Sequence, residues 1–177
     1  MNNWEEKNEV IIGNYGEDLV TNILEKQGYV VYRTSTDKSH PIDLIAIDTY
    51  NEDEIMYTEV KTKSRRYCCK DTGIDLHSWN RYLNLINENQ KKAYLFFVDE
   101  FEEAIYYCCI NRIYKEKKFR IKYDEGAKNG IVYFLLEDMK LSKRLKKEIV
   151  EHFKYLRATL NHPIKDELKY ENTPKYF

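Results

Sequence analysis

The chain has 177 residues, enough for one domain with a hydrophobic core, so neither a disulfide-stapled mini-protein nor a multidomain assembly is expected. Hydrophobic residues make up 42% and charged residues 33%, and only six glycines and three prolines are present, which excludes a collagen-like or low-complexity chain. With 29 Lys and Arg against 30 Asp and Glu, the net charge is −1, so attraction to nucleic acid must come from a local basic surface. We predict a single domain spanning 1–177.

The sequence contains no signal for a membrane or for an oxidising compartment. No stretch approaches the ~18–20 apolar residues that span a bilayer, and MNNWEEKNEV lacks the basic-then-apolar order of a secretory signal. The cysteines form two adjacent pairs, Cys68-Cys69 and Cys108-Cys109, and neighbouring thiols on a strand point to opposite faces, which suits neither a metal nor a redox motif. We predict a cytoplasmic protein with reduced thiols and no membrane partner.

The first half of the chain predicts a helix, three strands, a helix and a strand. Apolar residues at spacings of three and four predict a helix over 4–26, which Gly28 ends. Runs rich in Val, Ile, Tyr and Thr predict strands over 29–33, 42–48 and 55–62, of which the last two flank a polar turn and form an antiparallel hairpin. After a basic, irregular stretch, the pattern predicts a helix over 75–89 and an apolar strand over 93–98.

The second half predicts further strands and one more helix. We expect a strand over 104–110, two strands separated by a Gly-containing loop within 117–138, and a helix over 141–160. One stripe of that helix would carry Leu141, Leu145, Ile149, Phe153 and Leu156. The predicted fold class is therefore α/β (α+β) with a mixed sheet, a core over about 10–98, an elaboration over about 99–160 and a loosely held polar tail over about 161–177.

The register of the predicted hairpin brings charged residues together. With the turn centred near Asn51, the facing pairs are Ile47 with Ile55, Ile45 with Tyr57, and Asp43 with Glu59. Since side chains alternate along a strand, Lys61 lies on the same face as Glu59. Facing carboxylates among apolar residues are destabilising unless they are paired or bind a metal. The sequence therefore predicts a divalent cation here, and hard oxygen ligands favour Mg²⁺ or Mn²⁺ over Zn²⁺.

The first predicted helix adds a fourth charged residue. Glu17 lies on a face shared with Gly13, Val20 and Leu24, so its carboxylate is expected to point toward the sheet. Gly13 and Gly16 each cost about 1 kcal/mol relative to alanine in a helix interior. We therefore expect that close packing or the proposed site requires glycine at these two positions.

These residues resemble the PD-(D/E)XK nuclease superfamily. The matching motifs are Pro41-Ile42-Asp43 and Glu59-Val60-Lys61, preceded by Gly16-Glu17 in a helix and followed by the helix that carries Trp79 and Tyr82. The resemblance covers about 10–98 and implies a restriction-endonuclease-like core similar to that of Holliday-junction resolvases. One departure is Ile42 between the proline and the aspartate, where many members have Pro directly before Asp.

The resemblance implies a metal-dependent endonuclease that hydrolyses phosphodiester bonds in DNA. By that resemblance, Asp43, Glu59 and the carbonyl of Val60 would bind Mg²⁺ or Mn²⁺, and Glu17 would bind a second metal or its water shell. Lys61 would orient or help deprotonate the attacking water. A homodimer is a further expectation, since related nucleases often cut two strands with two subunits, and some relatives cut RNA.

A basic segment follows the predicted site. Its four cations are candidate nucleic-acid ligands: Lys63, Arg65, Arg66 and Lys70. The alternative interpretation of this segment is a solvated basic loop. His40 and Tyr82 are weaker candidates, because a loop histidine is commonly exposed and the tyrosine fits the packing face of its helix. Two other functions stay open, a non-catalytic nucleic-acid-binding or protein-interaction module on the same fold and a structural protein with an accidental motif.

Overall fold

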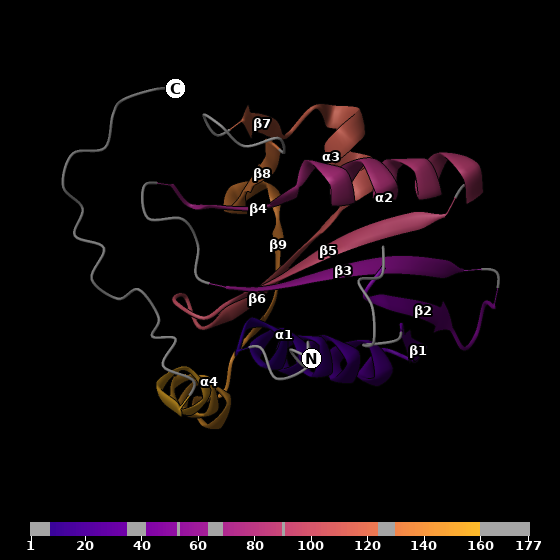
Figure 1. Ribbon diagram of the computed structural model, residues 1–177. Coiled ribbons are helices and arrows are strands. Elements are labelled where there is room, and N and C mark those ends of the chain that lie inside the picture. Colours follow the sequence, from indigo (N-terminus) through magenta and orange to yellow (C-terminus); the bar gives the residue numbers. More distant parts are fainter. Residues whose placement is uncertain are drawn as a thin grey trace, which may run out of the picture.

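The computed structural model describes residues 8–34, 42–52, 54–63, 69–89, 91–123 and 130–159. They form a six-stranded mixed sheet of order β1-β2-β3-β5-β6-β9 and a three-stranded sheet of order β4-β8-β7. The elements are α1 (Asn8–Lys26), β1 (Tyr29–Arg33), β2 (Leu44–Asp48), β3 (Ile55–Lys63), β4 (Asp71–Asp75), α2 (Leu76–Asn89), β5 (Lys92–Asp99), β6 (Ala104–Cys109), α3 (Ile110–Glu116), β7 (Arg120–Tyr123), β8 (Gly130–Leu135), β9 (Lys140–Arg144) and α4 (Lys147–Thr159). Helices α1 and α4 cover one face of the large sheet, and α2 and α3 lie on the other (Figure 1).

The predicted class and the order of the first half are confirmed. The predicted helix, three strands, second helix and further strand occur in that order, with one additional strand, β4, between β3 and α2. β3 pairs with β5 in parallel, while β1, β2 and β3 are antiparallel. The hairpin register is confirmed as well, because Ile47 pairs with Ile55 and Ile45 with Tyr57. β4 was not predicted, since five residues containing a glycine and two aspartates give no clear strand pattern.

The helix predicted over 141–160 is wrong in its first turns. Residues Lys140–Arg144 form β9, which pairs antiparallel with β6, and α4 begins only at Lys147. Leu141 is 49% exposed in that strand, so its four-residue spacing from Leu145 is coincidental. The backbone hydrogen bonds that β9 supplies to the edge of β6 outweigh the local helical pattern. The strand predicted over 104–110 likewise ends at Cys109, where the short helix α3 begins.

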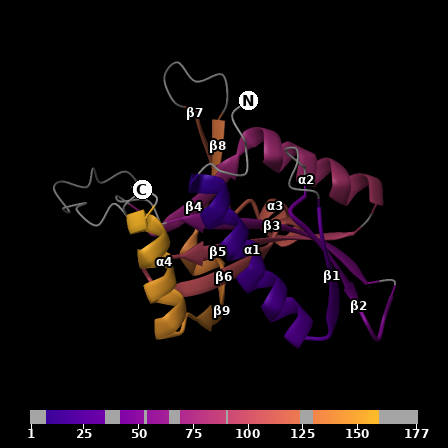
Figure 2. The same ribbon diagram turned by 60° about the horizontal axis from the view of Figure 1, so that its bottom comes forward.

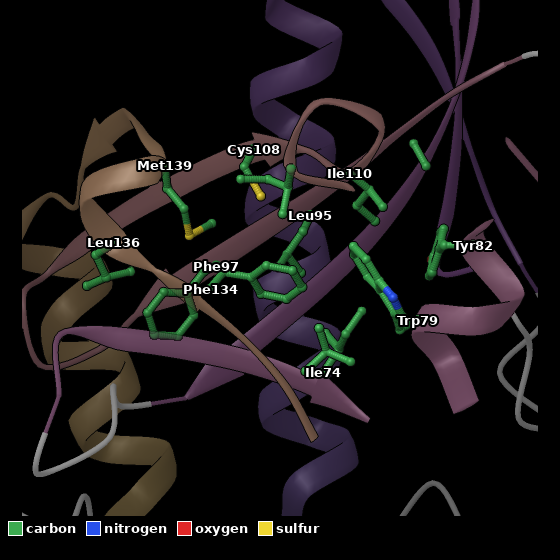
Figure 3. Close-up of a cluster of buried hydrophobic side chains, with 13 residues drawn as sticks. Ile74, Trp79, Tyr82, Leu95, Phe97, Cys108, Ile110, Phe134, Leu136 and Met139 are labelled. Carbon is green, nitrogen blue, oxygen red and sulfur yellow. The ribbon is translucent and has the colours of Figure 1, made fainter. Parts of the chain in front are cut away.

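Strand β5 lies in the middle of the molecule and is buried on both faces. Leu95 and Phe97 pack toward α2, in a cluster with Trp79 and Phe134 (Figure 3). Phe96 and the other alternating residues of β5 pack toward α1 and α4 in a second cluster. A strand enclosed on both faces requires a continuous apolar run rather than alternation, which is the pattern of residues 93–98.

Three cysteines lie among the described residues. Cys108 is buried in the cluster under α2, and burial raises the pKa of its thiol to about 12. The side chain of Cys109 is less buried, and Cys69, Cys108 and Cys109 form no disulfide within the described residues. Cys68 lies outside the described residues. Within the described part of the chain, no helix is long and apolar enough to cross a membrane.

Helix α1 packs tightly against β3 at Gly16. A Cβ atom placed there would lie 1.7 Å from Oγ1 of Thr62, whereas a Cβ at Gly13 would meet nothing within 4 Å. The packing reason expected for these glycines therefore holds for Gly16 and fails for Gly13. Close contact at Gly16 holds the next residue, Glu17, beside the end of β3.

We expect opposite effects of alanine at these two positions. Gly16→Ala should lower the free energy of unfolding by about 2 kcal/mol, because the new methyl group overlaps the side chain of Thr62. Gly13→Ala should raise it by about 0.5–1 kcal/mol, since a helix-interior glycine is replaced in open space. Urea unfolding of both variants measures the difference, and a change of the same sign in both would contradict this packing.

Candidate active site

The charged residues gather where strands β2 and β3 separate. β2 begins at Leu44, opposite Thr58, whereas β3 continues to Lys63. The backbone N–H of Asp43 donates to the carbonyl of Thr58 at 3.2 Å, which extends the hairpin register by one residue. Beyond this point the edge of β3 no longer has β2 as a neighbour. We call this region, with Asp43 at its base, the fork.

Asp43 is mostly buried at the fork. Its Oδ2 accepts a hydrogen bond from the backbone N–H of Val60 at 2.7 Å. Burial and then the neighbouring carboxylate of Glu59 raise the pKa of Asp43 to about 7, although Lys61 and the Val60 hydrogen bond act in the opposite direction. A carboxyl group that titrates near neutral pH between strands is the kind of group found in functional sites.

Glu59 is 4% exposed and has one partner for each carboxylate oxygen. Oε1 forms an ion pair with Nζ of Lys61, and Oε2 accepts a hydrogen bond from the Tyr82 hydroxyl at 2.7 Å. Burial lowers the pKa of Lys61, but the carboxylates of Glu59 and Asp43 outweigh it, so the net pKa is raised and the ammonium group stays charged at neutral pH. The Lys61 side chain retains 32% of its exposure, so this cation also faces solvent.

Glu17 joins the fork from α1 and is held by Arg33. The Arg33 guanidinium contacts Oε2 of Glu17 at 3.0 Å and Oδ1 of Asp18 at 2.7 Å. Burial raises the pKa of Glu17, while Arg33 and Lys61 partly oppose that shift. Because Glu17 in turn raises the pKa of Asp43, the four residues predicted for the site share one electrostatic environment. Arg33 was not singled out from the sequence; its position at the end of a predicted strand was the available signal.

Asp75 is a further carboxylate near Lys61 that the sequence did not indicate as part of the site. It precedes α2, and its two oxygens accept hydrogen bonds from the backbone N–H and the hydroxyl of Ser78, both at 2.8 Å. Burial alone would raise the pKa of Asp75, but the Ser78 hydrogen bonds and Lys61 outweigh it and the net pKa is lowered. The Asp-x-x-Ser spacing at a helix start predicts the cap, but not the proximity to Lys61.

Of the other predicted ligands, Val60, Lys63 and Lys70 lie among the described residues, and each has a different environment. The N–H and C=O of a strand residue point to the same neighbour, so the carbonyl of Val60 faces the same side as its N–H, toward Asp43. Lys63 donates through Nζ to the carbonyl of Gly73 at 2.7 Å, which ties β3 to β4. Lys70 is exposed. Three other candidates, His40, Arg65 and Arg66, lie outside the described residues.

The donor atoms at the fork fit a hard divalent cation bound mainly through water. Among the described residues, no group of three or more His, Cys, Asp or Glu side chains is arranged to hold a metal ion. Mg²⁺ commonly uses one or two carboxylates and keeps several waters, so Asp43 and Glu59 meet its requirement without a third side chain. Burial, and then the charge of Glu59, raise the pKa of Asp43 and disfavour its ionised form, which a cation would favour. Thiol and imidazole ligands, which Zn²⁺ prefers, are not part of this set.

Tyr82 was predicted mainly as a packing residue, and its hydroxyl also reaches the fork. The side chain is fully buried, near Trp79 on the inner face of α2 (Figure 3). Burial, the charges of Glu59 and Asp43 and the hydrogen bond to Glu59 raise the pKa of Tyr82 well above its ordinary value, so the group remains a hydrogen-bond donor. Its role in the structure is to fix one oxygen of Glu59.

We expect Tyr82→Phe to lower the free energy of unfolding by about 2 kcal/mol, because a charged buried acceptor loses its donor. Urea unfolding measures this loss. The matched control is Tyr57→Phe on the same face of the sheet, since the Tyr57 hydroxyl makes no hydrogen bond with the residues that the structure describes. Equal stability losses in the two variants would show that the bond to Glu59 contributes nothing specific.

The chain was compared with known proteins. No protein-family model and no curated protein matches the sequence. Among solved structures, the chain is similar to a Holliday junction resolvase, Hjc, from the archaeal hyperthermophile Archaeoglobus fulgidus, with 13% sequence identity, a TM-score of 0.46, and coverage of 79% of this chain and 88% of that chain. A likeness of this size assigns neither a family nor an activity, so the functional assignment depends on the fork itself.

Proposed function

We propose that the protein is a metal-dependent endonuclease of the PD-(D/E)XK type that hydrolyses phosphodiester bonds in DNA. The observation that supports this most strongly is the fork, where Asp43 and Glu59 share a single lysine and burial raises the pKa of Asp43 to about 7. Two desolvated carboxylates with one cation are costly for a purely structural role, and a bound divalent cation removes that cost.

The residues of the fork have distinct roles in this proposal. Asp43, Glu59 and the carbonyl of Val60 would hold Mg²⁺ or Mn²⁺, which supplies Lewis-acid stabilisation of the phosphate when bound. Lys61, charged and facing solvent, would orient the attacking water and stabilise negative charge on the phosphate. Tyr82 fixes Glu59, and Glu17 would bind a second metal or its water shell from the α1 side.

A non-catalytic nucleic-acid-binding module is the second candidate. It is favoured by the Lys61–Glu59 ion pair, which already satisfies one carboxylate, and by the lack of a three-ligand cluster among the residues placed in the structure. This function requires salt-sensitive binding to nucleic acid without cleavage, and no loss of function on replacement of Asp43 or Lys61.

A cleavage assay separates the two functions. Purified wild type is incubated with linear duplex, single-stranded and four-way-junction DNA and with RNA, in Mg²⁺, Mn²⁺ or EDTA. We expect metal-dependent cutting of DNA that Asp43→Ala reduces by about a thousandfold, while the exposed α1 variant Glu25→Ala keeps full activity. Full cleavage by folded Asp43→Ala would refute the proposed site, and cutting of RNA alone would keep the nuclease and change its substrate.

We also propose that two copies act together on a duplex, since each chain carries one fork and two strands must be cut. Light scattering of the protein alone and with duplex DNA tests this arrangement. A monomer under both conditions would exclude the homodimer.

A further inference from the structure

A basic and aromatic surface extends over α3 and β7. Residues 112–123 contain six Lys and Arg and one acidic residue. Lys118 and Arg120 form ion pairs with Asp138 and Asp71. Three other lysines are exposed and make no ion pair with any residue that the structure describes: Lys115, Lys117 and Lys122. We call these lysines, with the neighbouring residues Tyr114, Ile121 and Tyr123 of α3 and β7, the basic arm.

The apolar members of the basic arm are unusually accessible. Tyr114 is 49% exposed, Ile121 40% and Tyr123 63%. β7 pairs with β8 on one edge only, and these two strands project from the body of the molecule (Figure 2). On β7, Lys122 lies on one face of the strand and Ile121 and Tyr123 on the other, because side chains alternate. The exposed lysines match nucleic acid, because they neutralise phosphates.

The strand register connects the basic arm to the fork. Asp75 pairs with Ile131 across β4 and β8, and Ile131 pairs with Lys122 across β8 and β7, so these three residues form one row. Lys63, two residues after Lys61 on β3, donates through Nζ at 2.7 Å to the carbonyl of Gly73, two residues before Asp75 on β4, so this end of the row lies beside the fork. Two strand spacings place the Lys122 backbone about 10 Å from that of Asp75. That distance corresponds to about three base steps of a duplex at about 3.4 Å per step.

We propose that the basic arm is a second DNA contact, which binds the duplex a few base pairs from the phosphate held at the fork. This inference rests on the proposed function and adds a binding surface outside the segment 63–70. Cross-strand neighbours carry their side chains on the same face, so Lys122 shares a face with Asp75 at the edge of the fork.

Binding of metal-free protein to duplex DNA in EDTA, from 50 to 200 mM salt, tests the basic arm. The triple variant Lys115→Ala/Lys117→Ala/Lys122→Ala should lose about tenfold in affinity and lower the salt-dependence slope by about 2.7, since each phosphate contact contributes about 0.9. Tyr123→Ala, on the face of β7 opposite Lys122, should bind like wild type. The matched control Tyr155→Ala, on α4 across the large sheet and also 63% exposed, should bind like wild type.

Each outcome has a separate meaning. Wild type that binds duplex while the triple variant keeps its affinity and slope overturns the basic arm and leaves the nuclease proposal standing. Wild type that neither binds nor cuts any nucleic acid overturns both, and the arm would then be a surface for a protein partner. Circular dichroism of each variant confirms that a loss of binding is not a loss of folding.

Discussion

Asp43→Asn is expected to stabilise the metal-free protein and to abolish cleavage at the same time. The substitution keeps the shape of the side chain and an oxygen that can accept from the N–H of Val60. It removes a negative charge that burial and Glu59 oppose. Above neutral pH the gain in the free energy of unfolding should be about 3 kcal/mol, because the charged form is the one that folding disfavours. Loss of cleavage follows from the loss of a metal ligand.

The stabilisation by Asp43→Asn should depend on pH. The pKa of Asp43 is about 7 in the folded protein and 3.8 ordinarily, so the folded state binds more protons between these values. The free energy of unfolding of the wild type should therefore fall as pH rises from about 4 to 7 and then level off, and Asp43→Asn should lack this fall. Urea unfolding in EDTA between pH 5 and 8 measures both curves, with Glu25→Gln as a control. Parallel curves for wild type and Asp43→Asn would contradict the buried charge.

Lys61→Met is expected to have the opposite effect on stability. Glu59 would keep its bond from Tyr82 but lose the one cation that pairs with it among the residues the structure describes, and a buried carboxylate without a counter-ion is strongly destabilising. We expect a loss of about 3 kcal/mol in the free energy of unfolding, at the low end for a broken buried pair because Lys61 is partly exposed. Cleavage should be abolished as well.

Two further variants separate charge from geometry. Lys61→Arg keeps a cation beside Glu59 and should recover most of the stability but little of the cleavage, since a planar guanidinium cannot replace a compact ammonium group. In the Asp43→Asn background, Lys61→Met should cost about 1–2 kcal/mol less than in the wild type, because Lys61 then has one carboxylate fewer to neutralise. Additive stability changes would show that Asp43 and Lys61 do not interact.

Local patterns predicted the elements whose contacts are local. The β2–β3 hairpin and its register followed from alternation around a short polar turn, and β5 from a continuous apolar run. Elements determined by distant partners were missed or misassigned. β4 forms a sheet only with β8, and β9 is a strand only because β6 offers an open edge, so the leucine spacing around 141–145 pointed to a helix.

In the candidate site, too, the residues that are close in sequence were predicted, whereas most of their distant partners were not. Asp43, Glu59 and Lys61 come from one hairpin; Glu59 and Lys61 form an ion pair, and their charges act on Asp43, which accepts from the N–H of Val60, while the catalytic roles stay predictions. The groups that hold them come from elsewhere in the chain. Arg33 reaches Glu17 from the end of β1. Tyr82, which the sequence predicted mainly as a packing residue and kept as a weaker site candidate, reaches Glu59 from the inner face of α2.

β3 pairs with one strand that is close to it in sequence, β2, and with one that is far from it in sequence, β5, and this difference affects the order of folding. Its hairpin with β2 closes a short loop, whereas its parallel pairing with β5, in which Glu59 lies beside Leu95, closes a long one. The carboxylates of the hairpin therefore come together first in water, and they lose their hydration only when β5 and α2 dock. The late step of folding buries the charged carboxylates of the fork, which is unfavourable without a cation. We therefore expect a divalent cation to lower the unfolding rate of the assembled sheet, and to change the rate of hairpin closure much less.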